Sequence, residues 1–240
     1  MTEYHLNFFD SAIVGPLNTL ARNSWAIDQA IAFISFNHIV KGGVLMVLLW
    51  WGWFRQGERG AHEREHTIST LIGCAVALMV GRLMVLALPF RLRPMHQTDL
   101  HFTVPFGVAE GAMDGLSSFP SDHAVLFFAL ACGMFFISRA MGWVALIYTF
   151  VMIALPRIYL GLHYPTDILG GAAVGALICW VANKTLPQTP LVQYIKGLSF
   201  TRPEIFYPML FFVTYQIADL FENLRDIVGG IYKLIKSFVG

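Results

Sequence analysis

The sequence predicts an all-α integral membrane protein, a bundle of about six transmembrane helices preceded by an interfacial helix. The 240 residues are 56% hydrophobic and 13% charged, whereas soluble domains contain roughly 25% charged residues. The apolar residues are gathered in long blocks, which is typical of helices that cross a bilayer. The formal net charge of +1 excludes a broad basic surface for nucleic acid.

Residues 1–37 predict a helical segment that lies on the membrane surface. Apolar side chains recur there at roughly helical spacing, at Phe8, Phe9, Ile13 and Leu17. The segment lacks the basic start of a cleavable signal, and polar residues interrupt its apolar run. A partly ordered N-terminal arm is the alternative interpretation.

Apolar blocks predict the membrane-spanning helices in order along the chain. They cover residues 38–54, 67–89, 123–138, 143–160, 168–186 and 205–218. Tryptophans at the end of the first block predict an aromatic belt at the membrane interface. A stretch with Pro187, Pro190 and Pro203 is interpreted as a linker before the last block.

These blocks divide the chain into three parts. Residues 38–221 form the predicted transmembrane domain, with its catalytic core at residues 67–186, and residues 222–240 form an amphipathic tail. Gly171 and Gly175 are expected to allow close helix packing. Cys74, Cys132 and Cys179 are odd in number and lie in apolar blocks, so buried thiols are expected rather than a disulfide framework.

The distribution of basic residues predicts the orientation in the membrane. The loops after the first, third and fifth spans share one side, and they carry Arg55, Arg59, Arg64, Arg139, Lys184, Lys196 and Arg202. The positive-inside rule places that side in the cytoplasm and the other loops, with both termini, outside it. Some basic residues dilute this asymmetry, namely Arg22, Lys41, Arg225, Lys233 and Lys236.

Polar segments at residues 89–94, 119–123 and 157–167 all fall at span ends on the predicted outer side. Because successive loops alternate sides, the order of the spans alone brings these segments to one face. Arg93 and Arg157 offer forked, permanently charged donors that suit phosphate oxygens. Ser121 precedes a helix, where its hydroxyl and the free N–H groups of the first turn can hold an anion.

The histidines on this face predict phosphoryl transfer. Asp167 follows His163 by four residues, and a carboxylate bound to one ring nitrogen makes the other nitrogen a better nucleophile or base. His123 lies beside the predicted phosphate-binding turn, where it can protonate a leaving oxygen. A phosphate cradle, an oriented nucleophile and a separate proton donor together make a phosphoryl-transfer site.

Each of these residues also has a structural interpretation when taken alone. An arginine at a span end is commonly a membrane anchor, and a serine or aspartate there is commonly a helix cap. The joint occurrence of all three segments favours chemistry instead. A metal site on the histidines is disfavoured by the neighbouring arginines, so no metal or other cofactor is expected.

The three segments resemble the type 2 phosphatidic acid phosphatase superfamily of integral membrane lipid phosphatases. Arg93-Pro94 matches the family's first segment, Pro120-Ser121 with His123 matches its second, and Arg157, His163 and Asp167 match its third with both spacings intact. The resemblance covers about residues 67–186. It implies that His163 attacks phosphorus to form a phosphohistidine, while His123 protonates the leaving group and then activates water.

The sequence departs from the family pattern at three positions. Leu86 stands where a phosphate-binding lysine is expected, and Arg91 or Arg82 is expected to substitute for it. Asp122 replaces glycine, a variant similar to the undecaprenyl-diphosphate branch, and Pro156 replaces the serine that usually precedes Arg157.

The resemblance implies a metal-independent phosphatase of a bacterial inner membrane, whose site faces the periplasm or exterior. Undecaprenyl diphosphate is the expected substrate. Phosphatidylglycerol phosphate, phosphatidic acid and the lipid A phosphates are alternatives. A lipid phosphotransferase that uses the same intermediate and a non-enzymatic protein that binds lipid headgroups remain open. The expected partners are the lipid phosphate and the bilayer.

Overall fold

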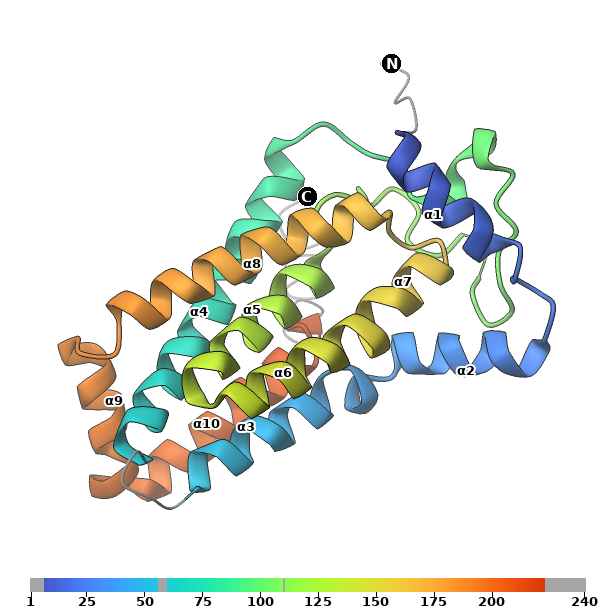
Figure 1. The fold of residues 1–240 in the computed structure, drawn as a ribbon. Helices are drawn as coiled ribbons and strands as arrows, with labels where there is room; N and C mark the ends of the chain where they lie inside the picture. Colours follow the sequence, from blue (N-terminus) through green and yellow to red (C-terminus); the bar gives the residue numbers. More distant parts are fainter. Residues whose placement is uncertain (1–6, 56–59, 110, 223–240) are drawn as a thin grey trace, which may run out of the picture.

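The structure is a computed structural model that describes residues 7–55, 60–109 and 111–222. Helices form at each predicted span (Figure 1). They are η1 (Ile39–Gly43) with α3 (Val44–Phe54), α4 (Gly60–Ala87), α5 (Asp122–Ile137), the run of α6 (Arg139–Tyr148), η4 (Thr149–Ala154) and α7 (Leu155–Tyr159), α8 (Pro165–Thr185) and α10 (Pro203–Ala218). Apart from residue 222, the predicted tail at residues 222–240 lies outside the described residues, and the three-part division of the chain stays a prediction.

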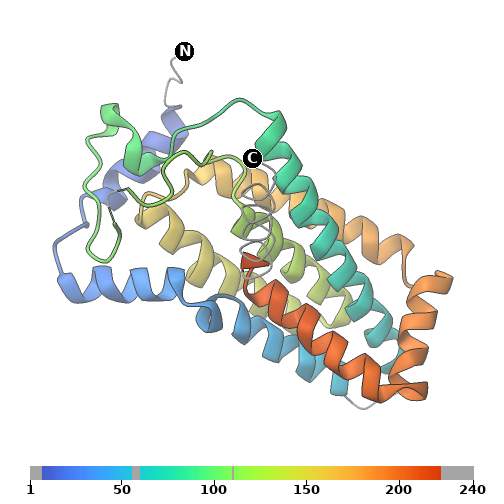
Figure 2. The ribbon, with the colours of Figure 1, turned by 180° about the vertical axis from the view of Figure 1, so that it is seen from behind.

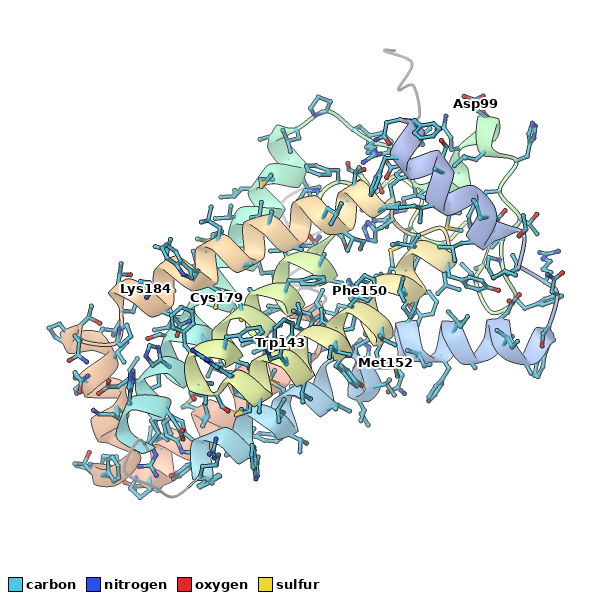
Figure 3. The ribbon with its side chains drawn as sticks, in the orientation of Figure 1. Asp99, Trp143, Phe150, Met152, Cys179 and Lys184 are labelled. Carbon is cyan, nitrogen blue, oxygen red and sulfur yellow. The ribbon has the colours of Figure 1, made fainter. Side chains whose placement is uncertain are left out.

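Several of these helices are long and apolar enough to cross a membrane. Among the described residues, three runs meet this criterion by length and composition, at His62–Ala87, Arg139–Tyr159 and Pro165–Thr185. A fourth span results if α2 (Trp25–Phe36) and the η1–α3 run, which meet at 65°, are counted together. Trp143 and Phe150 on the outside of the α6–η4 run are 58% and 50% exposed (Figure 3). This apolar surface suits a lipid environment.

The α5 helix lies between α4, α6 and α8, and it is buried around most of its circumference (Figure 1). Its 16 residues are surrounded mainly by protein. Glycines on α8 allow the closest approach, because a Cβ at Gly175 would lie 1.9 Å from the Val125 carbonyl oxygen and one at Gly171 would lie 2.8 Å from that of Ser121. The predicted packing role of this glycine pair is confirmed.

The N-terminal segment forms helices α1 (Phe8–Asn18) and α2. In Figure 1, α1 crosses the end of the bundle near the start of α8. The helices keep large apolar side chains exposed, among them Phe8, Trp25 and Phe33, as expected of a segment at a membrane interface. On the other face of α1, Asp10 and Val14 are buried.

The interpretation of residues 187–203 as a plain linker is wrong, because α9 (Pro190–Thr201) forms there. The Thr189 side chain accepts a hydrogen bond from the Val192 N–H, and Pro190 lies in the first turn, where its missing N–H costs nothing. Figure 2 shows α9 at the end of the bundle opposite α1. The cysteines are free thiols, with Cys74 and Cys179 fully buried.

Candidate active site

The three predicted polar segments meet around a cavity of about 300 Å³ at one end of the bundle. Most of the predicted site residues line it, namely Arg82, Arg93, His123, Arg157 and His163. The helix ends explain this convergence, because α4 and α7 end near this cavity while α5 and α8 begin there (Figure 1). The co-location expected from the order of the spans is confirmed.

The position of His163 defines which of its nitrogens faces the cavity. A turn between α7 and α8 carries it, and Gly161 adopts a φ of +71° there, which a glycine tolerates without strain. The His163 Nδ1 lies 2.9 Å from the Ser118 carbonyl oxygen, and its Nε2 lies 3.2 Å from Arg93 Nη1. A carbonyl only accepts and a guanidinium only donates, so Nδ1 carries the proton and Nε2 keeps its lone pair.

Asp167 lies beside His163 as expected, but the close hydrogen bond of the His163 ring goes to another oxygen. Asp167 Oδ2 lies 3.7 Å from His163 Nδ1, whereas the Ser118 carbonyl oxygen is closer. The carboxylate instead accepts hydrogen bonds from Arg91 Nη1 at 2.5 Å, from the Tyr164 N–H at 2.7 Å and from the Ser118 hydroxyl. Asp167 therefore orients His163 through the Ser118 residue, which the sequence interpretation missed.

The phosphate-binding role expected for Arg91 needs correction, because both of its Nη atoms are bound to buried carboxylates. Its Nη1 binds Asp167 and its Nη2 binds Asp10 Oδ2 at 2.7 Å. Asp10 also accepts hydrogen bonds from Thr166, through its N–H at 3.0 Å and its hydroxyl at 2.6 Å. Arg91 thus links two buried carboxylates and holds Asp167 in place. A buried carboxylate in an apolar segment commonly marks a functional position. Asp10 is such a carboxylate, and this signal could have identified it from the sequence.

Arg157 and His123 form the second half of the site. Arg157 Nη2 lies 2.5 Å from His123 Nε2, and it also approaches the Ser35 carbonyl oxygen at 3.5 Å. The Nε of Arg157 is buried and has no hydrogen-bond partner among the described residues, which is the arrangement expected of a guanidinium that awaits an anion. Pro156 lies in the first turn of α7, where proline is well tolerated.

Arg93 is held in place by main-chain oxygens. Its guanidinium donates to the carbonyl oxygens of Leu116, Ser117 and Leu162, the last at 2.6 Å from Nη1. Burial lowers the pKa of Arg93 from its ordinary value. Because all three acceptors are neutral, the guanidinium keeps its positive charge for a phosphate beside His163.

The remaining predicted ligands occupy less direct positions. Ser121 is buried and caps α5, since its hydroxyl accepts from the Ala124 N–H at 3.5 Å. It is not among the side chains that line the cavity. Arg82 does line the cavity, but its Nη2 pairs with Asp122 Oδ2 at 2.5 Å. Leu86 is 83% exposed and lies outside the cavity lining.

A possible metal-ligand cluster among the described residues consists of His38, Asp219 and Glu222. His38 Nδ1 lies 3.0 Å from Asp219, and its Nε2 lies 3.7 Å from Glu222. Ion pairing accounts for this cluster, since the two carboxylates approach opposite ring nitrogens. The catalytic candidates His123 and His163 are not part of it.

We predict that activity persists into acid further than an exposed histidine would allow. Burial, reinforced by the Arg93 charge, lowers the pKa of His163 from 6.5 to about 4, although the nearby Asp167 carboxylate acts in the opposite sense. The attack of His163 on phosphorus that the resemblance implies requires the neutral ring. The fall in kcat/KM on the acid side should therefore be centred near pH 4. The same shift makes folding stability rise with pH between about 4 and 6.5. A pH profile of phosphate release checks this, and a loss centred near pH 6.5 would contradict it.

The chain is similar to a known family and to proteins of two bacteria. A family model described as the PAP2 superfamily matches residues 88–189. The chain is 28% identical over 163 residues to "Undecaprenyl-diphosphatase BcrC" of Bacillus subtilis (strain 168), covering 68% of the chain and 76% of the relative. It is 33% identical over 160 residues to "Putative undecaprenyl-diphosphatase YbjG" of Escherichia coli (strain K12), covering 66% and 73%.

A solved structure also resembles this chain. It is a transmembrane PAP2 type phosphatidylglycerolphosphate phosphatase from Bacillus subtilis, with a TM-score of 0.46 and 20% identity, over 75% of this chain and 87% of that one. The matched family region, residues 88–189, contains His123, Arg157, His163 and Asp167. From the family model and the extent of these matches, the chain belongs to the PAP2 superfamily.

Proposed function

We propose that this protein is a metal-independent membrane phosphatase that removes the terminal phosphate of undecaprenyl diphosphate through a phosphohistidine. The observation that carries the proposal is one cavity that two histidines line. The Nε2 of His163 lies beside Arg93 there, and the Nε2 of His123 lies beside Arg157. The relatives named as undecaprenyl-diphosphatases support the choice of substrate.

The geometry supports a two-step reaction. His163 Nε2 attacks the terminal phosphorus, and the bond to the bridging oxygen breaks. His123, which takes up a proton at Nε2 when the phosphate binds Arg157, gives that proton to the bridging oxygen as lipid monophosphate leaves. Water then attacks the phosphohistidine, His123 takes up a water proton, and inorganic phosphate is released. Arg93 and Arg157 stabilise the charge on the phosphate oxygens, so the positive charge comes from side chains.

The rim of the cavity supports a lipid substrate. Val85, Met113, Leu116 and Leu220 line it beside the charged groups. A phosphate on an apolar tail fits such a site, because the headgroup reaches the arginines while the tail stays against apolar side chains.

The charges at the two ends of the bundle support a site that faces the periplasm or exterior of a bacterial inner membrane. Arg55 and Arg64 lie at the end of the bundle away from the cavity, where they stack on Trp51 and Trp53. Lys184 lies at the same end (Figure 3). Basic residues beside interfacial tryptophans favour the cytoplasmic side, so the cavity is assigned to the opposite side.

Phosphate release from a panel of lipids tests this proposal. Purified protein in detergent is given undecaprenyl diphosphate, phosphatidylglycerol phosphate, phosphatidic acid and a lipid A phosphate, with and without a chelator. We expect the highest kcat/KM for undecaprenyl diphosphate, unchanged by the chelator. A preference for another lipid would overturn the substrate, loss of activity with chelator would overturn metal independence, and label transferred to a lipid acceptor would indicate a phosphotransferase.

A further inference from the structure

Lys41 is a buried cation that belongs to none of the three polar segments. It is not among the side chains that line the cavity, but it contacts His123, which does line it. It is 2% exposed. Its Nζ lies 3.4 Å from His123 Nε2, 82 residues away in the sequence. An ionisable side chain buried among apolar helices is costly and commonly marks a functional position.

The local structure keeps Lys41 directed inward. It lies in η1, a π-helical turn at the 65° bend between α2 and α3, and such turns are frequent at functional sites. Asn37 Oδ1 accepts from the Val40 N–H at 3.0 Å, and the Tyr148 hydroxyl donates to the Val40 carbonyl oxygen. A Cβ at Gly42 would lie 2.4 Å from the Ala218 Cα, so only glycine lets this turn approach α10 so closely.

Lys41 and Arg157 converge on the same nitrogen atom. Arg157 Nη2 lies 2.5 Å and Lys41 Nζ lies 3.4 Å from His123 Nε2. Two buried cations this close repel each other, and an anion placed between them relieves the repulsion. The unpartnered Nε of Arg157 points to the same conclusion, since a phosphate oxygen would satisfy it.

We propose that Lys41 binds the substrate phosphate together with Arg157 and so supplies the cation that is absent at Leu86. This inference rests on the phosphatase function proposed above. Leu86 and its neighbours on α4 cannot supply the charge, because Leu86 is exposed and Arg82 is paired with Asp122. The phosphate-binding set of this chain is therefore completed from η1, outside residues 88–189.

Three variants test the proposal on the full-length protein: Lys41→Met, Lys41→Arg and, as a matched control, Lys184→Met. Lys184 lies at the far end of α8, where its Nζ contacts the rings of Phe136 and Trp180 (Figure 3). For each variant, kcat and KM are measured for undecaprenyl diphosphate. The inhibition constant of orthovanadate, which mimics phosphate, is measured as well.

We expect Lys41→Met to lower kcat/KM about 10²-fold, as for the loss of one charged donor to a transition state. The vanadate inhibition constant should rise about tenfold, and Lys41→Arg should recover most of both losses because it restores the charge. Lys184→Met should stay within about twofold of wild type.

Two results would overturn the proposal. One is a Lys41→Met protein with wild-type kcat/KM and vanadate inhibition. The other is an equal loss in Lys41→Met and Lys41→Arg without any change in vanadate inhibition, which indicates a structural role. If Lys41→Met does not give a monodisperse protein, Lys41→Gln is measured against the same criteria. The parent proposal fails separately, through retained phosphate release in His163→Ala.

Discussion

Replacing His163 by alanine is expected to lower kcat for phosphate release by about 10⁴-fold or more, because it removes the proposed nucleophile of the covalent step. The Nδ1 proton of His163 is bound to the Ser118 carbonyl oxygen, and its Nε2 lies at the cavity beside Arg93. The remaining activity would come from the arginines alone, which can still bind and polarise the phosphate. Release of inorganic phosphate from undecaprenyl diphosphate, followed with purified protein, measures the loss.

His62→Ala is the matched control for this variant. His62 is exposed at the other end of α4, with its ring 4.4 Å from that of His66, and its loss should leave kcat within about twofold. A His163→Ala protein that is monodisperse and releases phosphate at the wild-type rate would refute the phosphohistidine mechanism. Equal losses in the two variants would indicate a general effect on folding instead.

Replacing Asp167 by asparagine is expected to reduce both activity and stability. In enzymes whose carboxylate binds the catalytic histidine directly, changing that carboxylate to an amide lowers kcat about 10⁴-fold. Because Asp167 acts through Ser118, we expect a smaller loss of about 10²- to 10³-fold. Arg91 loses the Asp167 carboxylate and keeps that of Asp10, and weakening such a buried pair costs on the order of 3 kcal/mol of unfolding free energy. Thermal unfolding in detergent and phosphate release measure the two effects separately.

A double-mutant cycle between Asp167→Asn and Ser118→Ala tests the indirect contact. The two losses in kcat should be clearly less than additive, because both substitutions break the same link to His163. Asp99→Asn is the matched control, since Asp99 is exposed on the loop after α4 (Figure 3). Additive losses would show that Asp167 acts on His163 by another route.

Hydropathy and spacing were sufficient to locate the bundle helices. Apolar blocks of the right length predicted α4, the α6–η4–α7 run and α8, because a segment surrounded by lipid must be apolar along its whole length. The Gly171–Gly175 pair predicted a close helix contact, because small residues are what such contacts require, and the structure shows that the partner is α5. The α9 helix was missed, since its prolines were interpreted as linker residues although Pro190 begins a helix.

The pairing of site residues was harder to predict. Four-residue spacing placed Asp167 near His163, but it gave no information on the Ser118 backbone that lies between them. Arg91 was expected at the phosphate because its charge suits one, whereas the tertiary structure gives it two carboxylates. Asp10 reaches it from the far end of the sequence, and no local pattern reports a contact over 81 residues.

Residue types and short spacings were therefore enough to predict the membrane fold, the phosphatase class and the candidate residues His123, Arg157 and His163, because burial in lipid and reactivity toward phosphate depend on them. Only the tertiary structure showed which side chains hold these groups in place and which charged side chains lie beside them. Asp10 comes from α1 and Lys41 from η1, and they contact Arg91 and His123 respectively. Such contacts depend on how helices that are distant in the sequence pack against each other. The order of residues within one segment does not specify that packing.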